Sequence, residues 1–257
     1  MQTWNVLNTG INSSAWNMAL DEALLYGFKE HNLPILRIYG WEKALSFGRF
    51  SELAKILDMD KIEHNSISCV RRITGGGVLV HGNDISYSLI MPRRLLEGRS
   101  VKETYHYLSG FLIRFYEKLS LKAEFASDLN LEIQSSDICL AANEPYDIVI
   151  NGKKMGGNAQ RYIKHTLLQH GSIPISFDKK YFEPLFLKDS GLGRACSLQE
   201  LEVTLAYKDL VSLLMEAFCE TFNTTLIPKG LELSQEQYTQ ELLKNKYTHK
   251  RWNIYGK

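Results

Sequence analysis

Apolar residues recur at two different spacings along this chain, and each spacing predicts a kind of element. In AWNMALDEALLYGFKEH, residues 15–31, they return every three or four positions, which is the period of an amphipathic helix. Ser13 or Ser14 can cap the start of this helix, and Pro34 ends the element. The stretch VKETYHYLSGFLIRFYEKLSL has the same spacing, and we expect its apolar and aromatic stripe to pack in the core.

Shorter apolar runs between the two helices predict strands. We expect a short extended run at residues 4–7, and PILRIYGW and ALSFGRF as two strands joined by a polar turn. A further helix is expected from about Glu52 to His64. The segment SCVRRIT reads as another strand, and VLVHGND and ISYSLIMP beyond it look like a pair of strands.

The second half of the chain continues with strands and then turns helical. Asn151-Gly152 lies between apolar runs, a strong signal for a tight hairpin turn, and HTLLQHGSIPIS reads as a further strand. Two helical patterns follow, LVSLLMEAFCETF and SQEQYTQELLKNKY. We expect a catalytic domain over residues 1–200 and a helical segment over 201–257, packed on it or appended to it. This irregular order of elements predicts an α+β fold with a mixed or antiparallel central sheet flanked by helices.

Composition narrows the class of protein more than its function. A chain of 257 residues with 44% hydrophobic and 23% charged residues is typical of an ordinary globular protein. Its net charge of +1 provides no global field for nucleic acid or an anionic membrane, so neither is expected as a partner. No stretch approaches the roughly 18 apolar residues of a membrane span, the start lacks a signal-peptide pattern, and we expect a cytoplasmic protein. The four cysteines are scattered without a CxxC pair, so no metal site is expected.

The glycine run in RRITGGGVLVHGNDISYSLI is the most informative segment. Consecutive glycines after a strand let the backbone approach a ligand closely and adopt conformations closed to other residues. The run has neither the G-x-G-x-x-G spacing of dinucleotide-binding loops nor the Gly-Lys-Ser/Thr ending of a P-loop. From the glycines alone, a structural turn and a binding site both remain open.

The complete string resembles a motif of the lipoate–biotin protein ligase and octanoyltransferase superfamily, in which it lines the acyl-binding cleft. Arg71-Arg72, the glycines, His81 and Tyr87-Ser88 occur here in the order of that motif, and NGKKMGGNAQRYIKHTLLQHGSIPIS resembles its second half. The resemblance implies the biotin/lipoate protein ligase catalytic-domain fold. The substrate-binding residues that it implies are Arg72, Thr74, Gly75, Gly76, Gly77, His81, Tyr87, Ser88, Gly157, Asn158, Ala159, Gln160, His170, Gly171 and Ser172.

Lys154 occupies the position at which this superfamily places a lysine that points into the cleft. A fixed ammonium can stabilise the negative charge that develops on an acyl carbonyl or a phosphate. Lys153 is expected to face the other way, because neighbouring side chains alternate along a strand. For His170 we expect positioning of the substrate or of a loop rather than a direct part in catalysis.

Cys139 precedes Lys154 in DICLAANEPYDIVINGKKMGGNAQ, which resembles the cysteine-dependent octanoyltransferases of the LipM type. By this resemblance Cys139 and Lys154 are the catalytic residues. The cysteine thiolate would take an octanoyl or lipoyl group from octanoyl-acyl carrier protein and pass it to a lysine of a lipoyl domain, without a cofactor. The glycine-cleavage H protein or a dehydrogenase E2 would supply that domain, and Arg49, Lys153 and Arg161 could meet its acidic surface. We expect a monomer.

Two other functions remain open. An ATP-dependent lipoate–protein ligase would form lipoyl-adenylate, would need ATP and Mg, and would need no cysteine; Gly77 and the stretch His81 to Asp84 look more like such ligases. A non-catalytic binder of lipoyl domains is disfavoured by the presence of both Cys139 and Lys154. A biotin ligase is also disfavoured, because the loop GRGRxxR is absent.

Overall fold

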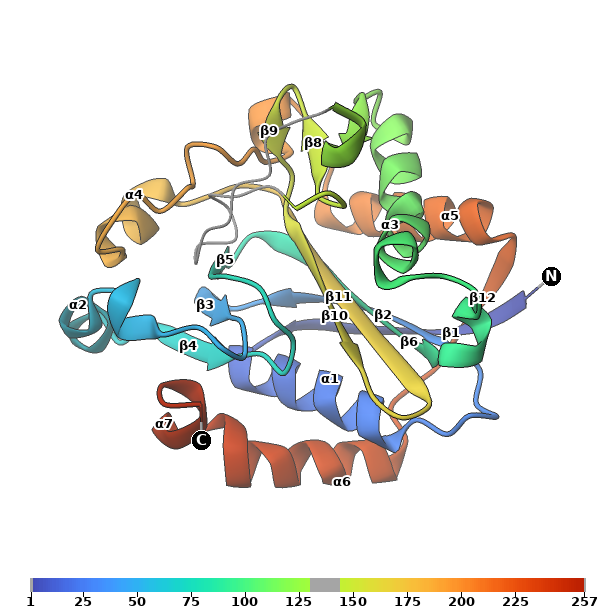
Figure 1. Cartoon of the computed structure of the whole chain (residues 1–257), viewed down its shortest axis with the longest axis horizontal. Coiled ribbons are helices and arrows are strands. Elements are labelled where there is room, and N and C mark those ends of the chain that lie inside the picture. Colours follow the sequence, from blue (N-terminus) through green and yellow to red (C-terminus); the bar gives the residue numbers. More distant parts are fainter. Residues whose placement is uncertain (1, 130–143, 257) are drawn as a thin grey trace.

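A six-stranded mixed sheet forms the centre of the protein, with the strand order β10-β11-β6-β2-β1-β12 (Figure 1). The structure is a computed structural model that describes residues 2–129 and 144–256. Its strands are β1 (Gln2–Asn12), β2 (Ile35–Trp41), β3 (Ala44–Phe47), β4 (Ser68–Arg71), β5 (Leu79–His81), β6 (Asp84–Pro92), β7 (Ala123–Phe125), β8 (Ile148–Ile150), β9 (Lys153–Lys154), β10 (Gly157–Tyr162), β11 (Thr166–Pro174) and β12 (Thr224–Pro228). Its α-helices are α1 (Ser14–Gly27), α2 (Met59–His64), α3 (Val101–Lys118), α4 (Lys179–Phe182), α5 (Tyr207–Phe222), α6 (Leu233–Leu242) and α7 (Lys250–Asn253).

The central sheet changes from antiparallel to parallel pairing at β2. The pairs β10–β11, β11–β6 and β6–β2 are antiparallel, whereas the pairs β2–β1 and β1–β12 are parallel. Two small sheets, β4-β3-β5 and β7-β8-β9, lie beside it. The predicted mixed central sheet flanked by helices is therefore confirmed.

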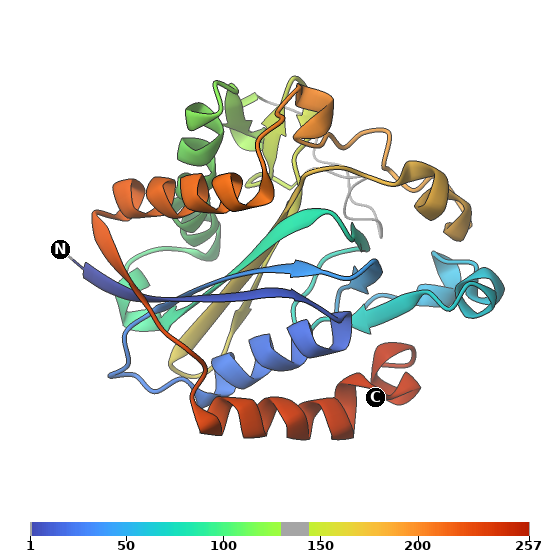
Figure 2. The ribbon, with the colours of Figure 1, turned by 180° about the vertical axis from the view of Figure 1, so that it is seen from behind.

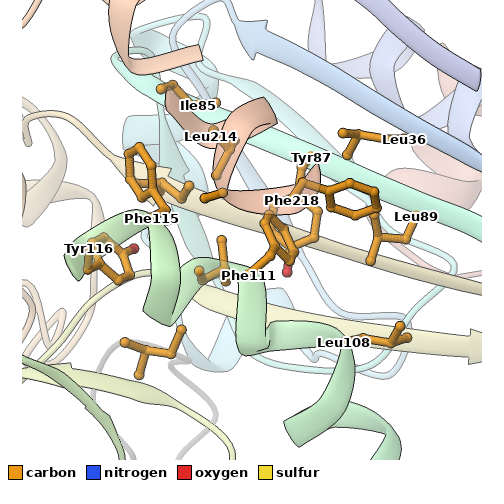
Figure 3. Close-up of a cluster of buried hydrophobic side chains, with 14 of the residues drawn as sticks. Leu36, Ile85, Tyr87, Leu89, Leu108, Phe111, Phe115, Tyr116, Leu214 and Phe218 are labelled. Carbon is orange, nitrogen blue, oxygen red and sulfur yellow. The ribbon is translucent and has the colours of Figure 1, made fainter. Parts of the chain in front are cut away.

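Helices cover both faces of the central sheet (Figures 1 and 2). Helices α3 and α5 pack together on one face, and α1 and α6 pack together on the other. Figure 3 shows how aromatic side chains fill the layer between the sheet and helices α3 and α5: the ring of Phe111 on α3 meets Phe218 of α5 and Tyr87 of β6 edge to face, and Phe115 belongs to the same buried cluster. The predicted core-packing role of the aromatic stripe is confirmed. Among the helices of the described ranges, none has the length and apolar character that a membrane span requires.

The first helix begins where its cap predicts. The side chain of Ser13 accepts a hydrogen bond from the backbone N–H of Trp16, so Ser13 is the N-cap. The preceding strand is longer than expected, because a register irregularity between Asn8 and Gly10 lets β1 continue to Asn12 instead of ending at residue 7.

Two predicted elements near the glycine run are wrong. Strands β5 and β6 do not pair with each other: β5 pairs with β3 in a separate sheet, and β6 lies between β11 and β2. The helix expected from Glu52 to His64 is a short turn at Leu53–Lys55 followed by α2, because the side chain of Asp58 caps a new helix through the N–H of Lys61.

The C-terminal residues contribute to every layer of the fold. Strand β12 extends the central sheet by pairing with β1, α5 packs on α3, and α6 packs on α1. The guanidinium of Arg71 donates to the carbonyl oxygens of Trp252 and Ile254, which holds the last residues against β4. The division of the chain at residue 200 stays a prediction.

Candidate active site

The glycine run forms a loop between β4 and β5 that a second segment holds in place. Gly76 has a φ of +93°, a conformation that favours glycine, and a Cβ at Gly48 would lie 1.9 Å from the carbonyl oxygen of Gly76. The backbone N–H of Arg49 donates to the carbonyl of Thr74 at 2.7 Å. The backbone of residues 48–49 therefore helps to fix the loop.

A narrow cavity, here called the slot, lies between this loop, β11 and α1. Its free volume is about 30 Å³. That is room for roughly two water molecules, so a longer ligand has to displace part of the wall. The remaining wall includes Met18, Tyr39, Trp41 and Leu79. The predicted substrate-binding residues that line the slot are Arg72, Gly76, His81, Gly157, Asn158, Ala159, His170, Gly171 and Ser172.

A wider and more polar cavity of about 400 Å³, here called the chamber, opens beside the slot. Gly76, Asn158 and Ala159 line both cavities, so the slot and the chamber adjoin. Phe50, 81% exposed, stands at the edge of the chamber. The predicted site residues that line the chamber are Gly75, Gly76, Gly77, Lys154, Asn158, Ala159 and Gln160.

Lys154 reaches the chamber from the predicted hairpin. Asn151 and Gly152 both have positive φ, at +51° and +75°, as a two-residue turn between β8 and β9 requires. Lys153 is exposed, whereas Lys154 is buried, so the two side chains face opposite ways as predicted.

The ammonium of Lys154 donates to Oδ2 of Asp147 at 2.5 Å, and both side chains are at most 3% exposed. Burial raises the pKa of Asp147, and the charge of Lys154 opposes that rise. An ammonium carries three N–H groups, so it can bind Asp147 and still stabilise charge in the chamber.

His170 connects the glycine loop to a buried charge network. Burial lowers the pKa of His170, so its ring is neutral near pH 7. In that state Nδ1–H donates to Asp21 at 2.9 Å, and Nε2 accepts from the hydroxyl of Thr74 at 2.8 Å. Burial alone would raise the pKa of Asp21, but Arg37, 2.6 Å away, together with His170 and Ser88, holds it below its ordinary value. This geometry supports a positioning role for His170.

His81 belongs to a second buried network at the opposite wall of the slot. Its Nδ1 lies 2.9 Å from Asp84, its Nε2 lies 2.7 Å from the hydroxyl of Ser46, and its ring stacks on Trp41. Arg72 donates to that hydroxyl and to the carbonyl oxygens of Gly75 and Gly77. Arg72 therefore connects the histidine network to the glycine loop.

Three predicted substrate-binding residues do not line either cavity but support the wall behind it. Thr74 bonds His170, the hydroxyl of Tyr87 donates to Oδ1 of Asn158 at 2.6 Å, and Ser88 bonds Asp21. Gly171 makes the contact between Tyr87 and Asn158 possible, because a Cβ there would lie 2.0 Å from Asn158 Oδ1.

Asp21, Arg37, Asp84 and Asp147 take part in the site and were not among the predicted site residues. One of them left a signal in the sequence. Asp21 falls on the apolar stripe of the first helix, at helical spacing from Leu24, where a charged residue has to find a buried partner. The partner itself is distant in sequence.

Cys139 lies outside the described residues. Glu144 lines the chamber, and only four residues separate it from Cys139 in the chain. The described thiols are poor nucleophiles: burial raises the pKa of Cys69 to about 12 and that of Cys196 to about 11. Residues 2–129 and 144–256 contain no group of three His, Cys, Asp or Glu side chains placed to hold a metal ion.

Comparison with known proteins identifies the family. The model of the lipoyl protein ligase A/B catalytic domain matches residues 13–219. Octanoyltransferase LipM of Exiguobacterium sp. is 32% identical over 270 residues, covering 97% of each chain, and that of Bacillus subtilis (strain 168) is 33% identical over 274 residues, covering 98% of each. A crystal structure of lipoate-protein ligase A bound with ATP aligns with a TM-score of 0.86 at 22% identity, over 98% of this chain and 99% of that one, and confirms the predicted fold. This protein therefore belongs to the lipoyl protein ligase A/B catalytic domain family.

Proposed function

We propose that this protein is an octanoyltransferase that moves an octanoyl group from octanoyl-acyl carrier protein to the acceptor lysine of a lipoyl domain. The observation that carries the proposal is the apolar-walled slot joined to a chamber that holds the buried Lys154–Asp147 pair. An unbranched acyl chain can enter the slot once it displaces part of the wall that Met18, Tyr39, Trp41 and Leu79 help to form, and the chamber suits its reactive carbonyl. The name of the two relatives, octanoyltransferase LipM, supports the same function.

In the first proposed step, the thiolate of Cys139 attacks the carbonyl carbon of the donor thioester. A new C–S bond forms and the C–S bond to the carrier breaks; the carrier leaves as a thiolate, which takes up the proton that Cys139 gave up on ionising. The carbonyl oxygen becomes negative in the tetrahedral intermediate. Lys154 and backbone N–H groups of the glycine loop are suited to stabilise that charge.

In the second proposed step, the neutral amine of the acceptor lysine attacks the octanoyl-cysteine. An amide bond forms, the C–S bond breaks, and one proton of the amine passes to the departing sulfur, so Cys139 is regenerated as a thiol. The first step exchanges one thioester for another, whereas the second makes the more stable amide and so drives the sequence forward. The reaction consumes no ATP.

Intact-protein mass spectrometry tests the covalent mechanism directly. The protein is mixed with octanoyl-acyl carrier protein, without ATP and without acceptor. We expect a gain of one octanoyl group, about 126 Da, which hydroxylamine removes because it cleaves thioesters. Cys139→Ser should abolish the gain. Cys69→Ser should leave it unchanged, because burial raises the pKa of Cys69 to about 12 and keeps that thiol protonated near neutral pH.

The same preparation distinguishes the alternative. If no adduct forms, and the lipoyl domain is modified only when lipoate, ATP and Mg are supplied, the protein is an ATP-dependent lipoate–protein ligase and the cysteine mechanism is wrong. The acceptor proposed for the assay is the lipoyl domain of glycine-cleavage H protein or of a dehydrogenase E2. We further propose that the protein acts in the cytoplasm as a monomer.

A further inference from the structure

A third cavity, with a basic lining, lies next to the chamber along the seam between β10 and α3. It has a free volume of about 490 Å³ and is here called the basic pocket. Four cationic side chains line it, against the two carboxylates of Glu30 and Glu97. The cationic residues are Arg93, Arg94, Arg99 and Lys164.

The basic pocket keeps a net positive charge, because four cationic side chains line it against the two carboxylates of Glu30 and Glu97. Among the residues that the structure describes, none of the four cationic side chains forms an ion pair with a carboxylate. Instead, Arg93 lies 5.3 Å from the ring of Tyr162, and Arg99 lies 4.1 Å from the ring of Tyr107. A concave surface with unneutralised guanidinium groups is suited to bind a phosphate.

The basic pocket and the chamber adjoin on both elements of the seam. On α3, Thr104 lines the basic pocket and Tyr105 lines the chamber; on β10, Tyr162 lines the basic pocket and Gln160 lines the chamber. The hydroxyl of Tyr162 donates to the side chain of Gln160 at 2.9 Å. A ligand along this seam would reach both cavities.

The backbone of β10 offers polar groups to such a ligand. The N–H of Ile163 donates to the carbonyl of Thr166 in β11. Because backbone groups alternate in direction along an antiparallel strand, the N–H and C=O groups of residues 161 and 159 also point to β11, whereas those of residues 158, 160 and 162 point to the open edge. The N–H of Gln160 confirms this direction, because it donates to the hydroxyl of Tyr105 on α3. Because Tyr105 occupies the N–H of Gln160, the outward groups left for the amides of an extended ligand are those of Asn158 and Tyr162 and the carbonyl of Gln160.

The distance along the seam fits one chemical class of ligand. Asn158, at the junction of slot and chamber, and Tyr162, at the basic pocket, are four residues apart, or about 14 Å along a strand. A phosphopantetheine arm has thirteen bonds from phosphorus to sulfur and two amides. If each three bonds of the arm extend as far as the three backbone bonds of one extended residue, about 3.3–3.6 Å, the arm spans about 15 Å.

We propose that the basic pocket binds the phosphate of the phosphopantetheine arm through which an acidic carrier protein holds the octanoyl group. The arm lies along β10, and the thioester at its end reaches the chamber beside Lys154. This assignment rests on the proposed function, and it names the part of the donor that the enzyme recognises away from the reacting carbonyl.

The experiment compares three octanoyl thioesters as donors to a lipoyl domain: octanoyl-pantetheine, octanoyl-4′-phosphopantetheine and octanoyl-carrier protein. The variant is Arg93→Gln/Lys164→Gln, and the matched control is Lys188→Gln/Lys208→Gln, which removes two exposed charges outside the slot, the chamber and the basic pocket. We expect KM of the variant to rise about tenfold for both phosphate-bearing donors, with kcat unchanged, since exposed charge-assisted hydrogen bonds are lost. KM for octanoyl-pantetheine, and all values of the control, should stay within about twofold of the unmodified enzyme.

Each other outcome overturns the assignment in a recognisable way. An equal loss with all three donors would mean general damage to the site, and no loss with any donor would mean that no phosphate binds there. A loss with octanoyl-carrier protein alone would replace the phosphate by an acidic protein surface. If the unmodified enzyme used none of the donors, the proposed function would fail and this assignment with it.

Discussion

The buried pair of Lys154 and Asp147 allows a quantitative test of how the site is held together. Asp147→Ala removes the carboxylate that lies 2.5 Å from the ammonium and leaves a cation in a position only 2% exposed. Removing one partner of a buried ion pair costs about 3–5 kcal/mol, because the remaining charge keeps its desolvation penalty without its counter-charge. In a chain of this size, 1 kcal/mol shifts Tm by about 2–4 °C, so we expect Tm to fall by about 6–20 °C.

The double variant Lys154→Met/Asp147→Leu removes both charges and so isolates the cost of leaving one of them without its counter-charge. Because it leaves no buried charge, it should be more stable than Asp147→Ala, by about 2 kcal/mol or more. The measurement is urea unfolding followed by circular dichroism, with Lys153→Met as the control for removing an exposed lysine of the same hairpin. If Asp147→Ala lost less than about 1 kcal/mol, or if the effects of the single variants Lys154→Met and Asp147→Leu simply added to that of the double variant, the pair would be hydrated and the reasoning would be refuted.

Three further outcomes are expected from the walls of the slot. Burial lowers the pKa of His170 below the unfolded value of about 6.5, so the stabilisation by the neutral ring is present above that pH and is lost as the pH falls toward the folded pKa. The free energy of unfolding should therefore differ less between about pH 5 and pH 7.5 in His170→Gln than in the unmodified protein. An unchanged difference would contradict this reasoning. Gly171→Ala should destabilise by about 1–3 kcal/mol and lower kcat/KM, whereas Gly110→Ala on α3, where an added Cβ would make only an ordinary contact with Thr221 at 3.7 Å, should be neutral or slightly stabilising in the same thermal assay. Met18→Ala should extend the accepted chain beyond octanoyl in acyl-enzyme mass spectra, at a cost of about 2–5 kcal/mol; an unchanged chain-length preference would remove Met18 from the acyl site.

The parts of the fold that local chemistry decides could be predicted from the sequence. The Asn151-Gly152 turn requires two residues with positive φ, and this requirement alone set the hairpin and the opposite directions of Lys153 and Lys154. The aromatic stripe of α3 likewise needed only helical spacing to predict its burial.

Elements that depend on distant partners could not be predicted in this way. Strands β5 and β6 are separated by Gly82 and Asn83, which looks like a hairpin, yet each pairs with a strand far away in the chain. Asp21 meets Arg37 and His170 only after α1, β2 and β11 have packed. No local pattern encodes such three-element contacts, and this is why a charged network behind the slot was missed while its lining was predicted.

The pairing of β1 with β12 has a consequence for the synthesis of the protein. Residues 2–6 pair with residues 224–228, so one side of β1 has no strand partner until the chain is almost completely made. At about 5–20 residues per second, a ribosome takes about 10–45 s to cover that interval. During this time the nascent chain presents an open sheet edge, a template for pairing with other chains. Protection of newly made chains by chaperones would therefore matter most for β1, whose Thr9 also accepts a hydrogen bond from Arg37 in the charged network behind the slot.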